Sequence, residues 1–304
     1  MKHSKSILAL AVVAALGSAA AHAGVVTPFD LKNPAGTLVT GADSLDWNAQ
    51  GSGVAKGIGP TDASTLLPIG ATFEFLYQSN LVSVAGGANV LGLGGLDTTP
   101  NGVANGQFEF TVAASFMQTV TSAAFIGPGD TNASAIFGLF ADPGNKVAIY
   151  YDTAMNANTS TGTGFDDGTK IAQFTIDAGE PGFETQSNFT STTDDTGQGS
   201  AKVHASLTGE GDFVNPAFLE SLNNLIFDFE FQSNLNVPSG TSSTAGFHIG
   251  GDATFPNYVV GANDILFKVD GDNTFTAQVP EPGSLALLGL GLAGLGFARR
   301  RKQA

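Results

Sequence analysis

The stretch TFEFLYQSNLVSV, residues 72–84, indicates the fold class because apolar and polar side chains alternate along it. Alternation with a period of two is typical of a β-strand that buries one face. The pattern predicts two sets of side chains on opposite faces, with Phe73, Phe75 and Tyr77 inward and Glu74, Leu76 and Gln78 outward. A chain built around such a strand is expected to be rich in β-structure.

A close copy of this stretch occurs much later in the chain. Residues 73–81 (FEFLYQSNL) and 227–235 (FDFEFQSNL) share the pattern F-[ED]-F-x-[YF]-Q-S-N-L within two predicted strands, residues 72–84 and 226–237. The separation is too large for the period of a solenoid repeat. Three interpretations remain open: equivalent positions in a sandwich, a duplicated half, or chance convergence of amphipathic strands.

Further predicted strands are short and are separated by Gly-, Asn- and Asp-rich turns. They cover residues 36–40, 107–120, 135–140, 146–151, 170–177, 201–207, 245–249, 265–269 and 274–279. One short helix is predicted, with Asn215 as N-cap, Pro216 at the first helical position and an end near Asn223 and Asn224. Because helices do not alternate with strands, we expect an all-β fold, an antiparallel β-sandwich or jelly roll with this one helix.

The charge distribution excludes one large class of partner. The chain of 304 residues has 27 acidic and 12 basic side chains, and its net charge is −15. Residues 24–278 contain no Arg and only scattered Lys. Nucleic acid is therefore not an expected partner, since nothing here neutralises a run of phosphates. The absence of Cys also excludes disulfides and thiol chemistry.

Residues 1–23 have the features of a secretory signal peptide. Lys2, His3 and Lys5 give a positive start, and an apolar run follows over residues 7–16. The sequence Ala21-His22-Ala23 fits the small-x-small rule for signal peptidase, so cleavage is predicted before Gly24.

The last 26 residues have three parts in a fixed order, residues 279–304. A Pro-rich hexapeptide comes first, then an apolar run at residues 285–298, then a basic cluster. The hexapeptide is Val279, Pro280, Glu281, Pro282, Gly283 and Ser284, and the cluster is Arg299, Arg300, Arg301 and Lys302. The apolar run is shorter than the roughly 20 residues of a full membrane span, so we expect a short transmembrane helix that is inserted transiently. The cluster is expected to stay cytoplasmic.

This tail resembles the PEP-CTERM sorting signal of Gram-negative bacteria, on the evidence of Pro280-Glu281-Pro282, the Leu/Gly-rich run and Arg299–Arg301. The resemblance implies processing by a membrane exosortase, delivery to the cell surface or medium, and association with extracellular polysaccharide. It gives three regions: a signal peptide (1–23), an extracellular β-sandwich domain (24–278) and a sorting signal (279–304).

The body more loosely resembles flocculation-associated PEP-CTERM proteins. The matching features are Phe29-Asp30-Leu31, Asn33-Pro34-Ala35 and the two FEF…QSNL-type strands. This resemblance implies a matrix protein that supports cell aggregation, flocculation or biofilm cohesion, with the exopolysaccharide or a neighbouring cell surface as partner.

Candidate binding residues follow from side-chain chemistry. Trp47, the single Trp, is a candidate sugar platform, as are Tyr77, Tyr150, Tyr151 and Tyr258; core packing is the alternative for each. They motivate an alternative function, a carbohydrate-binding module. Calcium is a candidate ligand at Asp270, Asp272 and Asn273, and at the turn Asp166-Asp167-Gly168, although neither fits an EF-hand and both suit ordinary turns.

Evidence for catalysis is weaker. A glycosidase needs two carboxyl groups at a defined separation, and Glu74, Glu109, Asp228 and Glu230 are candidates. Outward charges on alternating strands have a simpler explanation in solvation and edge protection. His204 and His248 are not at the spacing of a known motif. We therefore expect no enzymatic activity, and an extracellular hydrolase is the least favoured function.

Overall fold

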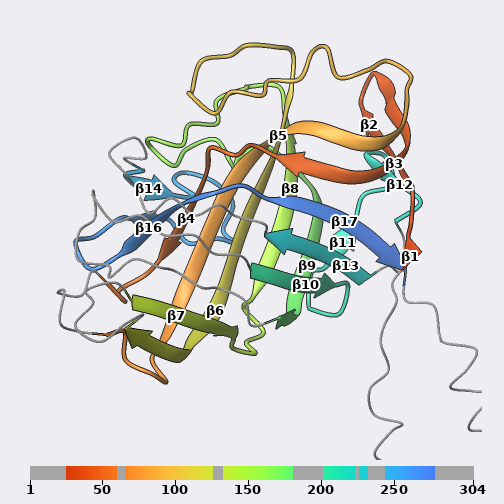
Figure 1. The fold of residues 1–304 in the computed structure, drawn as a ribbon. Coiled ribbons are helices and arrows are strands. Elements are labelled where there is room, and N and C mark those ends of the chain that lie inside the picture. Colours follow the sequence, from red (N-terminus) through yellow and green to blue (C-terminus); the bar gives the residue numbers. More distant parts are fainter. Residues whose placement is uncertain are drawn as a thin grey trace, which may run out of the picture. The chain divides into compact units, whose positions relative to one another are not determined.

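The computed structural model describes residues 25–59, 66–125, 133–180, 201–222, 226–231 and 244–277. Residues 26–276 form one compact unit, and the two chain ends, residues 1–25 and 277–304, group separately. The described residues contain strands and turns and no helix. The all-β prediction is therefore confirmed (Figure 1).

The strands range from two residues to eighteen. In chain order they are β1 (Val25–Val26), β2 (Phe29–Asn33), β3 (Gly36–Trp47), β4 (Gly51–Ala55), β5 (Thr72–Asn89), β6 (Glu109–Phe125), β7 (Ala133–Leu139), β8 (Lys146–Asp152), β9 (Thr169–Glu180), β10 (Ala201–Ser206), β11 (Phe213–Val214), β12 (Leu219–Glu220), β13 (Ile226–Phe231), β14 (Gly246–Phe247), β15 (Tyr258–Val259), β16 (Ile265–Val269) and β17 (Asp272–Ala277).

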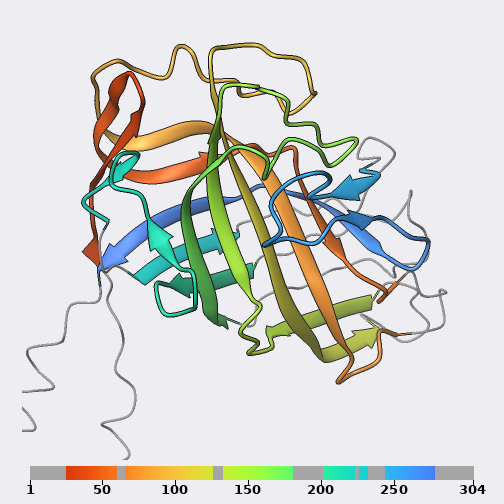
Figure 2. The same ribbon diagram turned by 180° about the vertical axis from the view of Figure 1, so that it is seen from behind.

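The principal strands pair antiparallel in one curled sheet that closes on itself. Its order includes β3-β17-β13-β10-β9-β8-β6-β5, and β5 also pairs with β3. The closing pair is β3–β17, in the register Ser44↔Thr274 to Asp46↔Asp272. The opposite edge of β3 pairs with β5 from Val39 to Trp47. Figures 1 and 2 show the long strands β5, β6 and β8 side by side, and in Figure 2 β17 crosses behind them.

Beyond a kink after β3 and a second kink before β17, two further strands continue the pairing. β4 follows β3 and also pairs with β5, while β16 precedes β17 and pairs with β4. At the second kink the Trp47 N–H donates to the Gly271 carbonyl (2.8 Å). A Cβ on Gly271 would lie 2.7 Å from the Tyr77 hydroxyl oxygen, so a residue without a side chain is required there.

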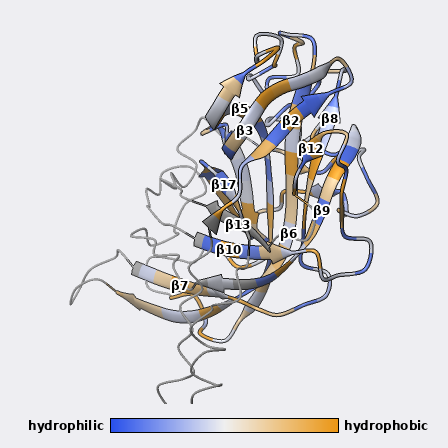
Figure 3. Ribbon diagram, turned by 90° about the vertical axis from the view of Figure 1, so that its right-hand side faces the viewer, coloured by the Kyte–Doolittle hydropathy of each residue, from blue (hydrophilic) through white to orange (hydrophobic). Residues whose placement is uncertain are grey.

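Aromatic side chains fill the inner face of the sheet. Phe75 packs on Phe116 and Phe267 with ring centroids 5.2 and 5.7 Å apart, and Phe73 meets Phe137 edge-on at 5.0 Å. Phe73, Phe75 and Tyr77 are buried, which confirms the face predicted from the alternating pattern. Figure 3 shows hydrophobic and hydrophilic residues interleaved along the strands, as that alternation requires.

The outer face of β5 is buried as well. Residues 244–260, called the strap below, pack on β5 and on the nearby strands β4, β6 and β8: Phe247 clusters with Val54 and Leu76, and Phe255 clusters with Ala113, Ala148 and Tyr150. The Gln78 side chain accepts a hydrogen bond from the His248 N–H (3.1 Å) and donates to the Gly246 carbonyl (3.2 Å). Leu76 and Gln78 therefore do point outward as predicted, but both are fully buried.

The predicted helix after Asn215 is wrong over the residues described. Phe218 and Leu219 N–H groups both donate to the Asn215 carbonyl (3.0 Å), which makes a single turn. The chain then enters β12, where Leu219 pairs with Leu31 of β2 and is buried. Pairing with an open sheet edge satisfies the backbone and buries Leu219, and this overrides the weak local preference for a helix.

The two copies of the repeated pattern lie in β5 and β13. In the closed sheet these strands flank the closing pair, with β5 beside β3 and β13 beside β17. Residues 232–235, the end of the second copy, lie outside the described residues.

The buried indole tests the sheet closure. Trp47 is fully buried and its Nε1–H donates to Asn273 Oδ1 at 2.6 Å, across a sequence separation of 226 residues. Trp47→Phe leaves this amide oxygen without its donor, so urea unfolding should show a loss of about 1–3 kcal/mol. The double variant Trp47→Phe/Asn273→Leu should recover part of the loss. If wild type and both variants are equally stable, the hydrogen bond from Trp47 to Asn273 does not stabilise the closed sheet.

The buried outer face gives a second expectation. Leu76→Ala removes a side chain packed under the strap and should lower the free energy of unfolding by about 2–4 kcal/mol. Val90→Ala, at a side chain that is 60% exposed, is the control and should cost less than about 0.5 kcal/mol. Similar small losses in both variants would show that the strap does not cover Leu76.

Candidate functional site

The aromatic residues predicted as sugar platforms are mostly internal. Trp47, Tyr77 and Tyr150 are fully buried, and Tyr151 is 9% exposed. Tyr258 is half-buried; its hydroxyl donates to Asp264 Oδ2 (2.6 Å), and Lys56 Nζ lies 4.4 Å from its ring centroid. The interpretation of Trp47 as a sugar platform is therefore wrong, because its indole packs in the core.

The predicted calcium turn at Asp270, Asp272 and Asn273 is the kink between β16 and β17. Asn273 is fully buried and its Oδ1 is used by the Trp47 indole. Asp272 sits opposite Asp46 in the closing pair. Burial is the main cause that raises the pKa of Asp270, and the nearby Asp46 adds to it. Asn273 thus has a structural role, and no group of three or more acidic, His or Cys side chains suited to a metal occurs among the described residues.

Glu74 and Glu109, two of the candidate catalytic carboxylates, lie far apart on the sheet. Glu74 on β5 forms an ion pair with Lys56, and its Oε1 accepts a hydrogen bond from Ser115 (2.6 Å). Glu74 lies opposite Met117 of β6. Met117 and Glu109 are eight residues apart on β6, which is roughly 25 Å at about 3.3 Å per residue. Asp228 and Glu230 lie on β13, opposite Thr274 and Asp272.

The two His residues are also apart. His204 lies on β10, while His248 of the strap hydrogen-bonds through Nε2 to the Tyr77 carbonyl of β5 (3.1 Å). In the sheet order β9, β8 and β6 separate β10 from β5. Glu74 and Glu109 thus do not form a catalytic pair, and the two His residues do not converge on one site.

The structure buries two carboxyl groups, Glu109 and Asp166, that the sequence pattern did not link to each other. Glu109 and Asp166 are 2% and 1% exposed. Burial is the main cause that raises the pKa of each to about 7, with Asp152 adding to the effect at Glu109 and Asp167 at Asp166. Glu109 Oε1 accepts from the N–H groups of Asn156 and Ala157 (2.9 and 3.3 Å).

No sequence signal separates these two acids from ordinary strand and turn residues, since both shifts arise from burial by distant segments. Glu109 holds the loop that follows β8, and Asp166 lies beneath the strap. Their positions suit structural roles.

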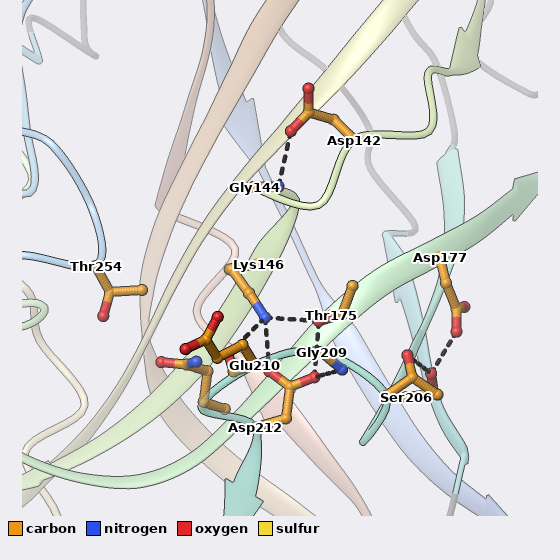
Figure 4. A network of polar contacts seen from close by, with 12 residues as sticks. Asp142, Gly144, Lys146, Thr175, Asp177, Ser206, Gly209, Glu210, Asp212 and Thr254 are labelled. Carbon is orange, nitrogen blue, oxygen red and sulfur yellow. Dashed lines mark hydrogen bonds and ion pairs between the residues drawn. The ribbon is translucent and has the colours of Figure 1, made fainter.

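A polar network centred on Lys146 ties the loop after β10 to the sheet (Figure 4). Lys146 Nζ donates to Thr175 Oγ1 (2.6 Å), Asp212 Oδ1 (2.8 Å) and the Glu210 carbonyl (3.3 Å). Asp212 Oδ2 accepts from Thr175 and from the Gly209 N–H, each at 2.7 Å. The Asp212 side chain is 1% exposed, so this ion pair is screened far less than a surface pair.

This network predicts a loss of stability in acid. Burial alone would raise the pKa of Asp212, but hydrogen bonds from Lys146, Thr175 and Gly209 outweigh it and lower that pKa. The stabilisation is present above the ordinary value of 3.8 and is lost as pH falls through the lowered value. Asp212→Asn should cost about 1–3 kcal/mol at neutral pH. The difference from wild type should shrink as the pH falls below 3.8.

Asp142→Asn is the matched control for that measurement. Asp142 is half-buried in a turn, where its Oδ1 accepts from the Gly144 N–H (2.7 Å), a bond that an Asn side chain retains. Chemical unfolding at several pH values should leave this control close to wild type. If Asp212→Asn has the same stability profile as the control, the network does not stabilise the fold.

The predicted processing sites lie outside the described residues: Ala21, Ala23 and Gly24 at the signal-peptidase site, residues 279–284 of the hexapeptide and residues 299–302 of the basic tail. The predicted C-terminal helix lies there too. Within the ranges that the structure does describe, no helix is both long and apolar enough to cross a membrane.

Comparison with known proteins gives one match. Residues 278–302 match the family model described as the PEP-CTERM protein-sorting motif. No curated protein and no solved structure matched the chain. The match confirms the sorting signal predicted from the tail. The chain therefore carries a PEP-CTERM protein-sorting motif, which indicates exosortase-dependent sorting to the cell surface or extracellular space of a Gram-negative bacterium.

Proposed function

We propose that this protein is a structural or adhesive component of the extracellular matrix, where it supports flocculation or biofilm cohesion. The sorting motif at residues 278–302 is the observation that carries this proposal, since it directs the β domain to the outside of the cell. The looser resemblance of the body to flocculation-associated proteins supports the same role. The partner would be exopolysaccharide or a neighbouring cell surface.

The proposed route begins with removal of residues 1–23 and transient anchoring in the inner membrane. The apolar run at residues 285–298 enters the membrane while Arg299–Arg301 remain cytoplasmic. The hexapeptide at residues 279–284 then lies at the outer face of the inner membrane, where two prolines keep it extended for the exosortase.

A scaffold function is supported over catalysis by the use of the polar side chains. Glu74, one of the four acids of the predicted hydrolase set, forms an ion pair with Lys56 and accepts a hydrogen bond from Ser115. The burial of Trp47 removes the main support for a carbohydrate-binding module that stacks sugars on an aromatic ring. Contact with a polysaccharide would then depend on polar and acidic side chains.

A deletion strain complemented with three versions of the gene tests this function. The full chain should restore floc settling and biofilm retention. A chain lacking residues 279–304 should not restore them, because the protein would not be sorted. The chain with Glu74→Gln should restore both, since a scaffold needs no catalytic carboxylate at this position.

The readouts separate sorting from function. Immunodetection in cell-surface and medium fractions reports delivery. The intact mass of the extracellular form should correspond to a chain that begins at Gly24. If the deletion strain flocculates normally while the protein is delivered in wild type, the proposed function is wrong although the sorting assignment stands. Delivery of Glu74→Gln without restored flocculation would favour a hydrolase.

A further inference from the structure

The loop between β5 and β6 contains two Asn-Gly pairs, Asn101-Gly102 and Asn105-Gly106. Asparagine before glycine is prone to spontaneous deamidation, because the small glycine lets its backbone nitrogen approach the asparagine side chain. All four residues are exposed. Sequence and exposure therefore predict the same reactivity for both pairs, and only the hydrogen bonds around them differ.

The first pair is held at its backbone and at its side chain. The Gly102 N–H donates to the Ala157 carbonyl (2.8 Å), and the Asn101 N–H donates to the Thr99 carbonyl (2.8 Å). Asn101 Oδ1 accepts a hydrogen bond from the Val103 N–H (2.8 Å). The Gly102 nitrogen cannot attack the Asn101 side chain until its bond to Ala157 breaks, so this pair is protected in the folded protein.

The second pair has neither restraint. The Asn105 side chain and the Gly106 N–H make no hydrogen bond with any residue that the structure describes. The Asn105 N–H donates to Asp97 Oδ2 (2.9 Å), a bond that does not involve the reacting atoms. A Cβ on Gly106 would lie 2.6 Å from the Gly95 carbonyl oxygen, so the fold itself requires a glycine after Asn105.

We propose that Asn105 is a site of spontaneous deamidation in the exported protein, whereas Asn101 is protected. The Gly106 nitrogen forms a bond to Asn105 Cγ, the bond from Cγ to the side-chain nitrogen breaks, and ammonia leaves with the proton of the Gly106 N–H. Water then opens the resulting succinimide at either carbonyl and gives aspartate or isoaspartate. Water is the only co-reactant.

The product changes the loop in two ways. It adds a negative charge close to Asp97, which is 2% exposed and already accepts hydrogen bonds from Thr99 and Asn105. Isoaspartate also adds a methylene to the backbone before Phe108, whose carbonyl accepts from the Asp97 N–H (2.8 Å). Both changes weaken contacts that close the loop, so deamidated molecules should open it more often.

Peptide mapping of the exported protein tests the site. A folded sample and a urea-unfolded sample are incubated in mildly alkaline buffer and then digested after glutamate, which releases both pairs on the peptide of residues 75–109. In the folded sample Asn105 should deamidate at least about tenfold faster than Asn101, because Asn101 reacts only through local opening. In urea the two rates should agree within about threefold, since unfolding removes the bond to Ala157.

Matched variants separate the two pairs. Asn105→Gln should lose the fast reaction, because ring closure from glutamine needs a less favourable six-membered ring. Asn101→Gln is the control and should keep the fast reaction at Asn105. Fragmentation that distinguishes the two products should find isoaspartate as well as aspartate at position 105, since the succinimide opens at either carbonyl.

Deamidation at Asn105 with Asn101 intact in the folded sample supports the proposal. A rate at Asn101 that is comparable to or above the rate at Asn105 overturns it, as does a folded sample that stays unmodified while the unfolded sample reacts. Aspartate without isoaspartate would mean direct hydrolysis and would exclude attack by Gly106. Equal hydrogen exchange of residues 95–108 in modified and unmodified protein would contradict the loosening of the loop.

Discussion

The pairing of β3 with β17 is the contact on which the rest of the sheet depends. It joins β3, the first long strand, to β17, the last described strand of the chain. It thereby turns an open row of antiparallel strands into a closed sheet. The hydrogen bond from Trp47 to Asn273 lies inside this pair, and the Gly271 kink beside it allows β16 and β4 to continue the pairing. The inner face becomes enclosed only because this last pair forms.

Closure also explains how a chain without cysteine builds a stable domain. An enclosed inner face gives one continuous core rich in Phe, and the strap adds smaller clusters on the outer face. The few basic residues of the body are used locally: Lys56, Lys146 and Lys170 each pair with an acid that joins two segments. Hydrophobic burial supplies most of the stability, and these pairs fix the position of loops and strap.

The sequence allowed prediction of the parts that depend on local pattern. Alternation at Phe73, Phe75 and Tyr77 predicted both the strand and its inner face, and the three-part tail predicted the sorting motif. Long-range packing was not predictable in the same way. Nothing local to Trp47 indicates a partner 226 residues away, and nothing near Leu76 indicates that a strap covers the outer face. The segment after Asn215 has helix-start signals, but an open edge at β2 pairs with it instead.

A disulfide engineered across β3 and β17 tests sheet closure most directly, because the native chain has no Cys. The Trp47–Gly271 backbone bond makes Asp46 and Asp272 a non-hydrogen-bonded pair, in which opposing side chains lie closest. Asp46→Cys/Asp272→Cys should form an intramolecular disulfide, seen as a mobility shift on reduction, whereas Asp46→Cys/Asp142→Cys should not. If both thiols stay free in the folded Asp46→Cys/Asp272→Cys protein, the sheet is not closed through β3 and β17.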